Sequence, residues 1–136
     1  MSVAYVVAPL VGWLMAGSLK FVVNSVRSRR LAWDLIGYGG MPSTHTAIVT
    51  TTAFLVGLKE GWATPIFSIA VTVAFIVVID ALSLRRQIGA HAAALNLLRR
   101  DEPAYTPLRE RMGHHRLEIL GGVLVGFAGA LLLSLV

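Results

Sequence analysis

Apolar segments of helical length recur along this 136-residue chain, and they restrict its fold more than any other feature. Residues 4–26, 64–82 and 117–136 each approach the roughly 20 apolar residues that a helix needs to cross a bilayer core about 30 Å thick. A shorter segment, 45–58, predicts either a fourth span or a re-entrant half-helix. Because 56% of the residues are hydrophobic and only 14% are charged, lipid is the expected solvent of much of the surface. The sequence therefore predicts one all-α integral-membrane domain over residues 1–136, a polytopic bundle of about four transmembrane helices.

Positive charge gathers in the two longer connections, 27–44 and 83–116, whereas the connection 59–63 contains a single basic residue, Lys59. Short loops rich in lysine and arginine stay on the cytoplasmic side of a membrane. We therefore expect both long connections to be cytoplasmic and both termini to lie on the opposite side. Ten of the twelve basic residues are in these two connections: Arg27, Arg29, Arg30, Arg85, Arg86, Arg99, Arg100, Arg109, Arg111 and Arg116.

The second long connection begins with a segment, 84–100, in which leucine, isoleucine and alanine recur at helical spacing between pairs of arginines. This pattern predicts an amphipathic helix near the membrane interface, which the two following prolines should end. In an alternative with no role in a site, Arg99 and Arg100 only reach toward anionic headgroups.

Unusual polar side chains stand at the cytoplasmic ends of all four apolar segments, at or within about two turns of the expected helix termini. Unrelated polar residues would be scattered over both membrane faces, so their common location predicts a single site. The set comprises Lys20, Arg27, Ser43, Thr44, His45, Asp80, Arg85, Arg86, His114, His115 and Glu118.

The residue types at the first two helix ends are those that bind phosphate. Lys20 and Arg27 are seven residues apart and therefore lie on one stripe of a helix. A lysine inside a span costs about 2.5–3.5 kcal/mol on insertion scales, so Lys20 needs a partner or a function. In the stretch GGMPSTHTA, residues 39–47, a proline and the hydroxyls of Ser43 and Thr44 start a helix whose free amides attract anions.

The third helix end adds an acid and two arginines. Arg85 and Arg86 would make bidentate contacts with phosphate oxygens. Asp80 would support them, or would simply pair with Arg85 or Lys20. The convergent residues therefore predict an anion site suited to phosphate.

Two histidines offer catalytic groups for such a site. His114 and Glu118 are at i and i+4, so the carboxylate can hold one ring nitrogen and leave the other for a substrate. His45 could protonate a leaving oxygen, or alternatively be a helix-start residue hydrogen-bonded to the backbone. His115, at i, i+3 from Glu118, could replace His114 or have no role. Because the chain has no cysteine, disulfides, thiolate metal sites and cysteine nucleophiles are excluded.

Three stretches resemble the divergent PAP2 family, membrane proteins related to acid phosphatases and vanadium haloperoxidases. GGMPSTHTA is similar to that family's GGMPSSHSA element, and IDALSLRRQIGAHAAALN and MGHHRLEILGG are similar to two later elements. The resemblance covers most of the chain. It implies a reduced version of the six-helix core of the PAP2 superfamily, in which one histidine is the phosphate nucleophile and another the acid.

The superfamily motifs can be carried over residue by residue. Lys-x6-Arg-Pro is matched by Lys20 and Arg27, with Ser28 at the proline, and Pro-Ser-Gly-His is matched by Pro42, Ser43 and His45, with Thr44 at the glycine. The third motif, Ser-Arg-x5-His-x3-Asp, is split by a long insertion. Its arginine would be Arg85, with Arg86 equally near, and its histidine and acid would be His114 and Glu118.

The resemblance and the residues together favour a lipid phosphatase that uses no metal or other cofactor. The expected substrates are phosphatidic acid, phosphatidylglycerol phosphate or a polyprenyl (pyro)phosphate, with His114 as nucleophile, His45 as acid and the active site facing the cytoplasm. The alternative is a non-catalytic protein that binds or transports phospholipid headgroups. A metal-ion transporter is disfavoured because the arginines would repel a cation.

The expected partners are a phosphorylated lipid, membrane lipids and a second copy of the chain, and not nucleic acid. Gly121, Gly122, Gly126 and Gly129 in the last apolar segment predict close helix packing. This glycine face is one candidate contact of a homodimer. Alternatively, it packs only against other helices of the same chain.

Overall fold

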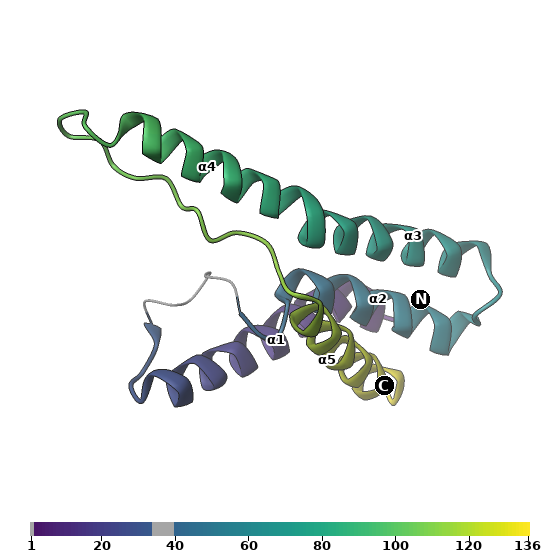
Figure 1. Ribbon diagram of the computed structural model, residues 1–136. Helices are drawn as coiled ribbons and strands as arrows, with labels where there is room; N and C mark the ends of the chain where they lie inside the picture. Colours follow the sequence, from purple (N-terminus) through teal and green to yellow (C-terminus); the bar gives the residue numbers. More distant parts are fainter. Residues whose placement is uncertain (1, 34–39) are drawn as a thin grey trace.

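The computed structural model describes residues 2–33 and 40–136, and within them all regular structure is helical, as predicted (Figure 1). Gly39, the first residue of the GGMPSTHTA stretch, lies outside the described residues. The elements are α1 (Ala4–Ser28), α2 (Thr44–Glu60), α3 (Pro65–Ile79), the single-turn π-helix η2 (Asp80–Leu84), α4 (Arg85–Arg99) and α5 (Arg116–Ser134).

Helix α2 lies at the centre of the bundle and packs against α1, α3 and α5. Its 17 residues extend about 25 Å, because an α-helix rises 1.5 Å per residue. Two of its buried threonines donate hydrogen bonds along the helix, Thr50 Oγ1 to Thr46 O and Thr51 Oγ1 to Ala47 O, each 2.7 Å long. The hydroxyls of these two threonines are therefore satisfied within the helix.

Helix α2 is shorter than the three helices that are long and apolar enough to cross a membrane, so whether segment 45–58 forms a fourth span or a re-entrant half-helix stays a prediction. The Tyr5 hydroxyl, at the start of α1, donates to the carboxylate of Glu60, at the end of α2. At this same end a small apolar core joins Ala8, Leu55 and Ala130. The end of α2 therefore lies beside the start of α1, and the two helices run antiparallel (Figure 1).

The long helices of the bundle are apolar enough to cross a membrane. Ala4–Ser28, Pro65–Arg99 and Arg116–Ser134 each meet the length and hydropathy expected of a membrane span. Both termini lie at the end where α2 turns into α3, and the arginine-rich connections lie at the other end (Figure 1). The protein is thus a helical membrane bundle, with three spans of full length around the shorter α2.

The glycines of α5 allow its backbone to approach that of α2. A Cβ atom at Gly122 would lie 2.5 Å from the Ser43 carbonyl oxygen, and one at Gly126 would lie 2.0 Å from Thr50 Oγ1. Both distances are impossible for real atoms, so only glycine fits. The glycine face that was one candidate for a dimer contact is therefore occupied by α2 of the same chain, while the oligomeric state itself stays a prediction.

The amphipathic helix predicted over 84–100 is present as α4, but it is not a separate helix. It continues α3 through η2, so that Pro65–Arg99 form 35 consecutive helical residues about 52 Å long. This length exceeds the roughly 30 Å core of a bilayer. The sequence pattern hid the continuity because hydropathy changes at Asp80 while the helix does not end there. As a consequence, α4 extends beyond the rest of the bundle (Figure 1).

Candidate active site

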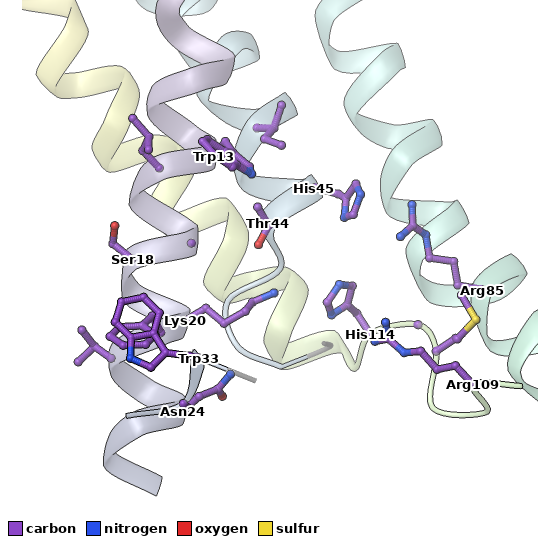
Figure 2. Close-up of a pocket in the computed structure, with 18 residues that line it drawn as sticks. Trp13, Ser18, Lys20, Asn24, Trp33, Thr44, His45, Arg85, Arg109 and His114 are labelled. Carbon is purple, nitrogen blue, oxygen red and sulfur yellow. The ribbon is translucent and has the colours of Figure 1, made fainter. Parts of the chain in front are cut away.

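A pocket of about 790 Å³ lies between α1, α2 and the junction of η2 with α4. The segment that follows α4 and returns to α5, here called the return segment (residues 101–115), closes its arginine-rich end. Five basic or imidazole side chains line the pocket from these elements: Lys20, His45, Arg85, Arg109 and His114 (Figure 2). The predicted convergence of polar residues is therefore seen for Lys20, His45, Arg85 and His114.

His114 and Glu118 form the most specific pair in the site. His114 is buried, and its Nδ1 lies 2.7 Å from Glu118 Oε2. An ionised carboxylate can only accept a hydrogen bond, so Nδ1 is the donor, and in the neutral ring this tautomer leaves the lone pair on Nε2. The same carboxylate oxygen accepts the backbone N–H of His115 at 3.2 Å, which fixes its position at the start of α5. His114 is thus oriented by a third group and lines the pocket.

Backbone contacts hold His114 at the π-helical turn of η2. The His114 N–H donates to the Ala81 carbonyl at 3.0 Å. Gly113 has φ +87°, and a Cβ atom there would lie 2.6 Å from Arg86 Cγ, so this position requires glycine. The Ser43 N–H donates to the Glu118 carbonyl at 2.8 Å, which joins the start of α5 to the start of α2. The site therefore forms where three helix ends are connected by backbone hydrogen bonds.

The start of α2 contributes a helix N-terminus and two side chains. Ser43 is fully buried, and its Oγ accepts from Thr46 Oγ1 at 2.9 Å and from the Thr46 N–H at 3.4 Å, so it caps the helix. Thr44 and His45 line the pocket, close to the positive end of the helix dipole. No hydrogen bond joins the His45 ring to the backbone in the part of the chain that the structure describes. The alternative of a backbone-bonded His45 is therefore not what is seen.

The π-helical turn decides which of the two arginines faces the pocket. In a π-helix the repeating pair is i, i+5, and Arg85 Nε donates to Asp80 Oδ2 at 2.7 Å across this spacing. Asp80 thus pairs with Arg85, one of its predicted roles, and Arg85 lines the pocket beside His45. Arg86 instead lines a small adjoining pocket of about 70 Å³ with His115 and Arg111. Of the two arginines, Arg85 is therefore the one that lines the main pocket.

Six of the eleven predicted residues do not line the main pocket: Arg27, Ser43, Asp80, Arg86, His115 and Glu118. Three of these six, Arg27, Arg86 and His115, are also exposed. Arg27 is exposed and lies about 10 Å along α1 from Lys20, beyond the pocket. His115 is exposed at the start of α5, and it borders only the small adjoining pocket. Arg109, which was not among the predicted residues, lines the pocket from the return segment. The sequence could have indicated Arg109, because it lies five residues before His114 and follows two prolines that indicate an irregular path.

Asn96 on α4 fastens the return segment by four hydrogen bonds. Its Oδ1 accepts from the Tyr105 hydroxyl and from the Leu108 N–H, both at 2.7 Å. Its Nδ2 donates to the Leu108 carbonyl at 2.8 Å and to Glu110 Oε1 at 2.7 Å. Further along, a Cβ atom at Gly89 would lie 2.2 Å from the Glu110 carbonyl oxygen, so the segment contacts the α4 backbone directly. These contacts guide residues 109–114 into the site.

Comparison with known proteins identifies the family of this chain. The family model described as "Divergent PAP2 family" matches residues 1–129. The chain belongs to the divergent PAP2 family. It is also 30% identical over 138 residues to a protein described as the uncharacterized membrane protein YuiD of Bacillus subtilis (strain 168), covering 89% of this chain and 87% of that protein. No solved structure matches it significantly.

In this divergent PAP2 protein, the structure brings together Arg85 and His114, the two residues that the resemblance assigned to one split motif. Arg85 and His114 are separated by 28 residues, yet both line one pocket. The Ala81 carbonyl, four residues before Arg85, accepts the His114 backbone N–H and so brings the two parts together. The insertion that separates them is α4 and the return segment, an excursion that starts and ends at the site (Figure 1).

Proposed function

We propose that the protein is a phosphatase for lipids that carry a terminal phosphate or pyrophosphate. The observation that carries the proposal is a buried histidine held by a carboxylate at 2.7 Å, in a pocket that it shares with Lys20, His45 and Arg85. A protein that only binds phosphate needs the cations but does not need an imidazole that a carboxylate orients through one ring nitrogen. Membership of a PAP2-related family supports the same conclusion.

In the first step, His114 Nε2 attacks phosphorus. An N–P bond forms, the P–O bond to the leaving group breaks, and His45 donates a proton to the departing oxygen. Glu118 holds the Nδ1 proton and stabilises the charge that the ring gains. Lys20, Arg85 and the amides at the start of α2 stabilise the equatorial oxygens of the transferring group.

In the second step, a water molecule attacks the phosphohistidine. His45, now neutral, accepts a proton from this water, the N–P bond breaks, and inorganic phosphate leaves. The cycle returns both histidines to their starting forms. It uses no metal, so we expect EDTA to leave the rate unchanged, and an EDTA-sensitive rate would contradict this mechanism.

Phosphate release by purified protein tests the proposal. We would supply phosphatidic acid, phosphatidylglycerol phosphate and polyprenyl (pyro)phosphates in detergent micelles. His45→Ala should lower turnover at least ~10²-fold and His114→Ala more, while His115→Ala, the exposed neighbour, serves as the matched control and should change it little. Lipid binding without phosphate release by the wild type would instead support a headgroup-binding or transport protein.

We also propose that this site faces the cytoplasm, since the arginine-rich connections are at the same end of the bundle. The chain has no cysteine, so single cysteines can be introduced without other changes. Cysteines at Ser28 and Thr106 should react with a membrane-impermeant reagent only from the cytoplasmic side, and one at Ala63, in the turn after α2, only from the other side. Labelling of Thr106 and Ala63 from the same side would contradict this orientation.

A further inference from the structure

The pocket extends beyond its charged groups, along α1 toward the middle of the membrane. Trp13, Leu14 and Gly17 line it on α1, and Ile48 lines it on α2. Trp13 is seven residues before Lys20, which corresponds to about 10 Å along the helix axis. A volume of about 790 Å³ is within the range of pockets that enclose whole drug-sized molecules, so a phosphate group occupies only part of it. The remaining space has apolar walls.

This apolar end of the pocket opens sideways. Its lining residues come from α1 and α2, and no described residue of α3, the helix on the other side of α2, lines it (Figure 2). Trp13 and Leu14 are 54% and 56% exposed, and they lie in the middle of a helix long enough to span the membrane. At that depth an exposed side chain faces hydrocarbon. This opening therefore leads into the bilayer.

Gly17 has no packing role that explains a glycine inside a helix. A Cβ atom there would meet nothing within 4 Å, whereas one at Gly12, on the same helix, would lie 2.5 Å from Thr51 Oγ1. Glycine weakens a helix relative to alanine, so its presence usually has a local reason. Gly12 lets α1 approach α2. Gly17 leaves open the space between the apolar end of the pocket and Lys20.

We propose that this space binds the first part of the substrate's hydrocarbon tail, which enters through the apolar end of the pocket, and that Gly17 is the residue that determines whether the tail fits. The inference rests on the proposed function for the phosphate headgroup at Lys20. It names the substrate class as a membrane-embedded lipid phosphate and excludes small soluble phosphoesters as the preferred substrate. A lipid in the cytoplasmic leaflet reaches the histidines without leaving the membrane.

A photo-crosslinking experiment tests the tail site independently of hydrolysis. The probe is phosphatidic acid with a diazirine in its acyl chain, in phosphatidylcholine nanodiscs. We expect crosslinks on residues 13–21 of α1, reduced on the order of 10-fold or more in Gly17→Trp and Gly17→Leu. Ala128→Trp is the matched control, because it adds the same bulk at an exposed position of α5 outside the pocket. Thermal unfolding of each variant verifies that it is folded.

Hydrolysis provides a second readout of the same groove. The ratio of the rates on long-chain phosphatidic acid and on butyl phosphate should fall about 10-fold in Gly17→Trp and stay constant in Ala128→Trp. Crosslinks confined to other helices, or equal behaviour of the two tryptophan variants, would overturn the tail site. If the wild type crosslinks through residues 13–21 but releases no phosphate, the proposed hydrolysis fails and the tail site stands.

Discussion

The two sides of α2 are built in opposite ways. Toward α5 the helices touch backbone to backbone, because Gly122 and Gly126 leave no room for a side chain beside Ser43 and Thr50. On its other side, the same helix borders a pocket of about 790 Å³. The packed side gives a fixed position to the start of α2, and the open side leaves space for a ligand there. A short helix such as α2 can therefore support a site even though its hydropathy signal is weaker than that of the longer helices.

The candidate nucleophile is located where these two sides meet. His114 lies two residues before the start of α5, the helix of the packed side, while it also lines the open pocket. The hydrogen bond from the Ser43 N–H to the Glu118 carbonyl joins α5 to α2 at this point. The arrangement explains how a site at the ends of several helices keeps its geometry.

The largest effect should come from adding bulk on the packed side. Gly126→Leu places a side chain where a Cβ atom already lies 2.0 Å from Thr50 Oγ1, so we expect a loss of about 3 kcal/mol or more, with aggregation during purification. The same substitution at Gly17, on the open side, should change stability by no more than about 1 kcal/mol. Thermal unfolding and size-exclusion chromatography in detergent measure both. Equal stabilities would show that the two sides do not differ as described.

The next effect concerns charge on the open side. Arg85→Ala removes a cation that lines the pocket, and we expect turnover to fall about 10²-fold. Arg27→Ala is the matched control, since this arginine is exposed beyond the pocket, and it should change turnover less than about twofold. Steady-state kinetics on a lipid phosphate gives both values. A stronger loss in the Arg27 variant would mean that the site extends further along α1.

Sequence reasoning predicted close packing of the glycine face, with a second copy and the same chain both left open as its partner, and it predicted only part of the open side. The apolar segments and the glycine pattern depend on local periodicity, which a single sequence displays. The position of Arg109 and the choice between Arg85 and Arg86 depend on the π-helical turn and on the return segment. Neither has a periodic signal, and the change in hydropathy at Asp80 suggested a boundary within what is one continuous helix. The hydrogen bond between His114 and Ala81 is a tertiary contact between residues far apart in the sequence, so no local pattern predicts it.

A smaller effect should follow from loosening the return segment. Asn96→Ala removes four hydrogen bonds that guide Arg109 and His114 into the pocket, so we expect kcat to fall about 10-fold with little change in KM. Glu102→Gln, which breaks the ion pair with Arg99 at the distant end of the segment, should have no such effect.

A paired substitution distinguishes positioning from general damage to the fold. In Asn96→Asp with Glu110→Gln, the donor and the acceptor of one hydrogen bond exchange places, so kcat should recover in part relative to Asn96→Asp alone. Unfolding temperatures are measured in parallel. If kcat falls only in proportion to lost stability, Asn96 has no positioning role.

The smallest effect is expected on dilution. We predict a homodimer, and because α2 occupies the glycine face of α5, its contact must use another surface of the bundle. Mass photometry in detergent should detect two copies at nanomolar concentration, with little loss of activity per chain. A monomer with full activity would contradict this prediction and show that a single chain is sufficient for activity.

The central claim is that His114 is the nucleophile, and trapping the covalent intermediate tests it most directly. Purified protein would be mixed with a lipid phosphate, quenched with alkali, which preserves phosphohistidine, and analysed by peptide mass spectrometry. We predict one phosphoryl group on His114, present in the wild type and in His115→Ala and absent in His114→Ala. Full turnover without this modification, or phosphorylation of another residue in the wild type, would contradict the account.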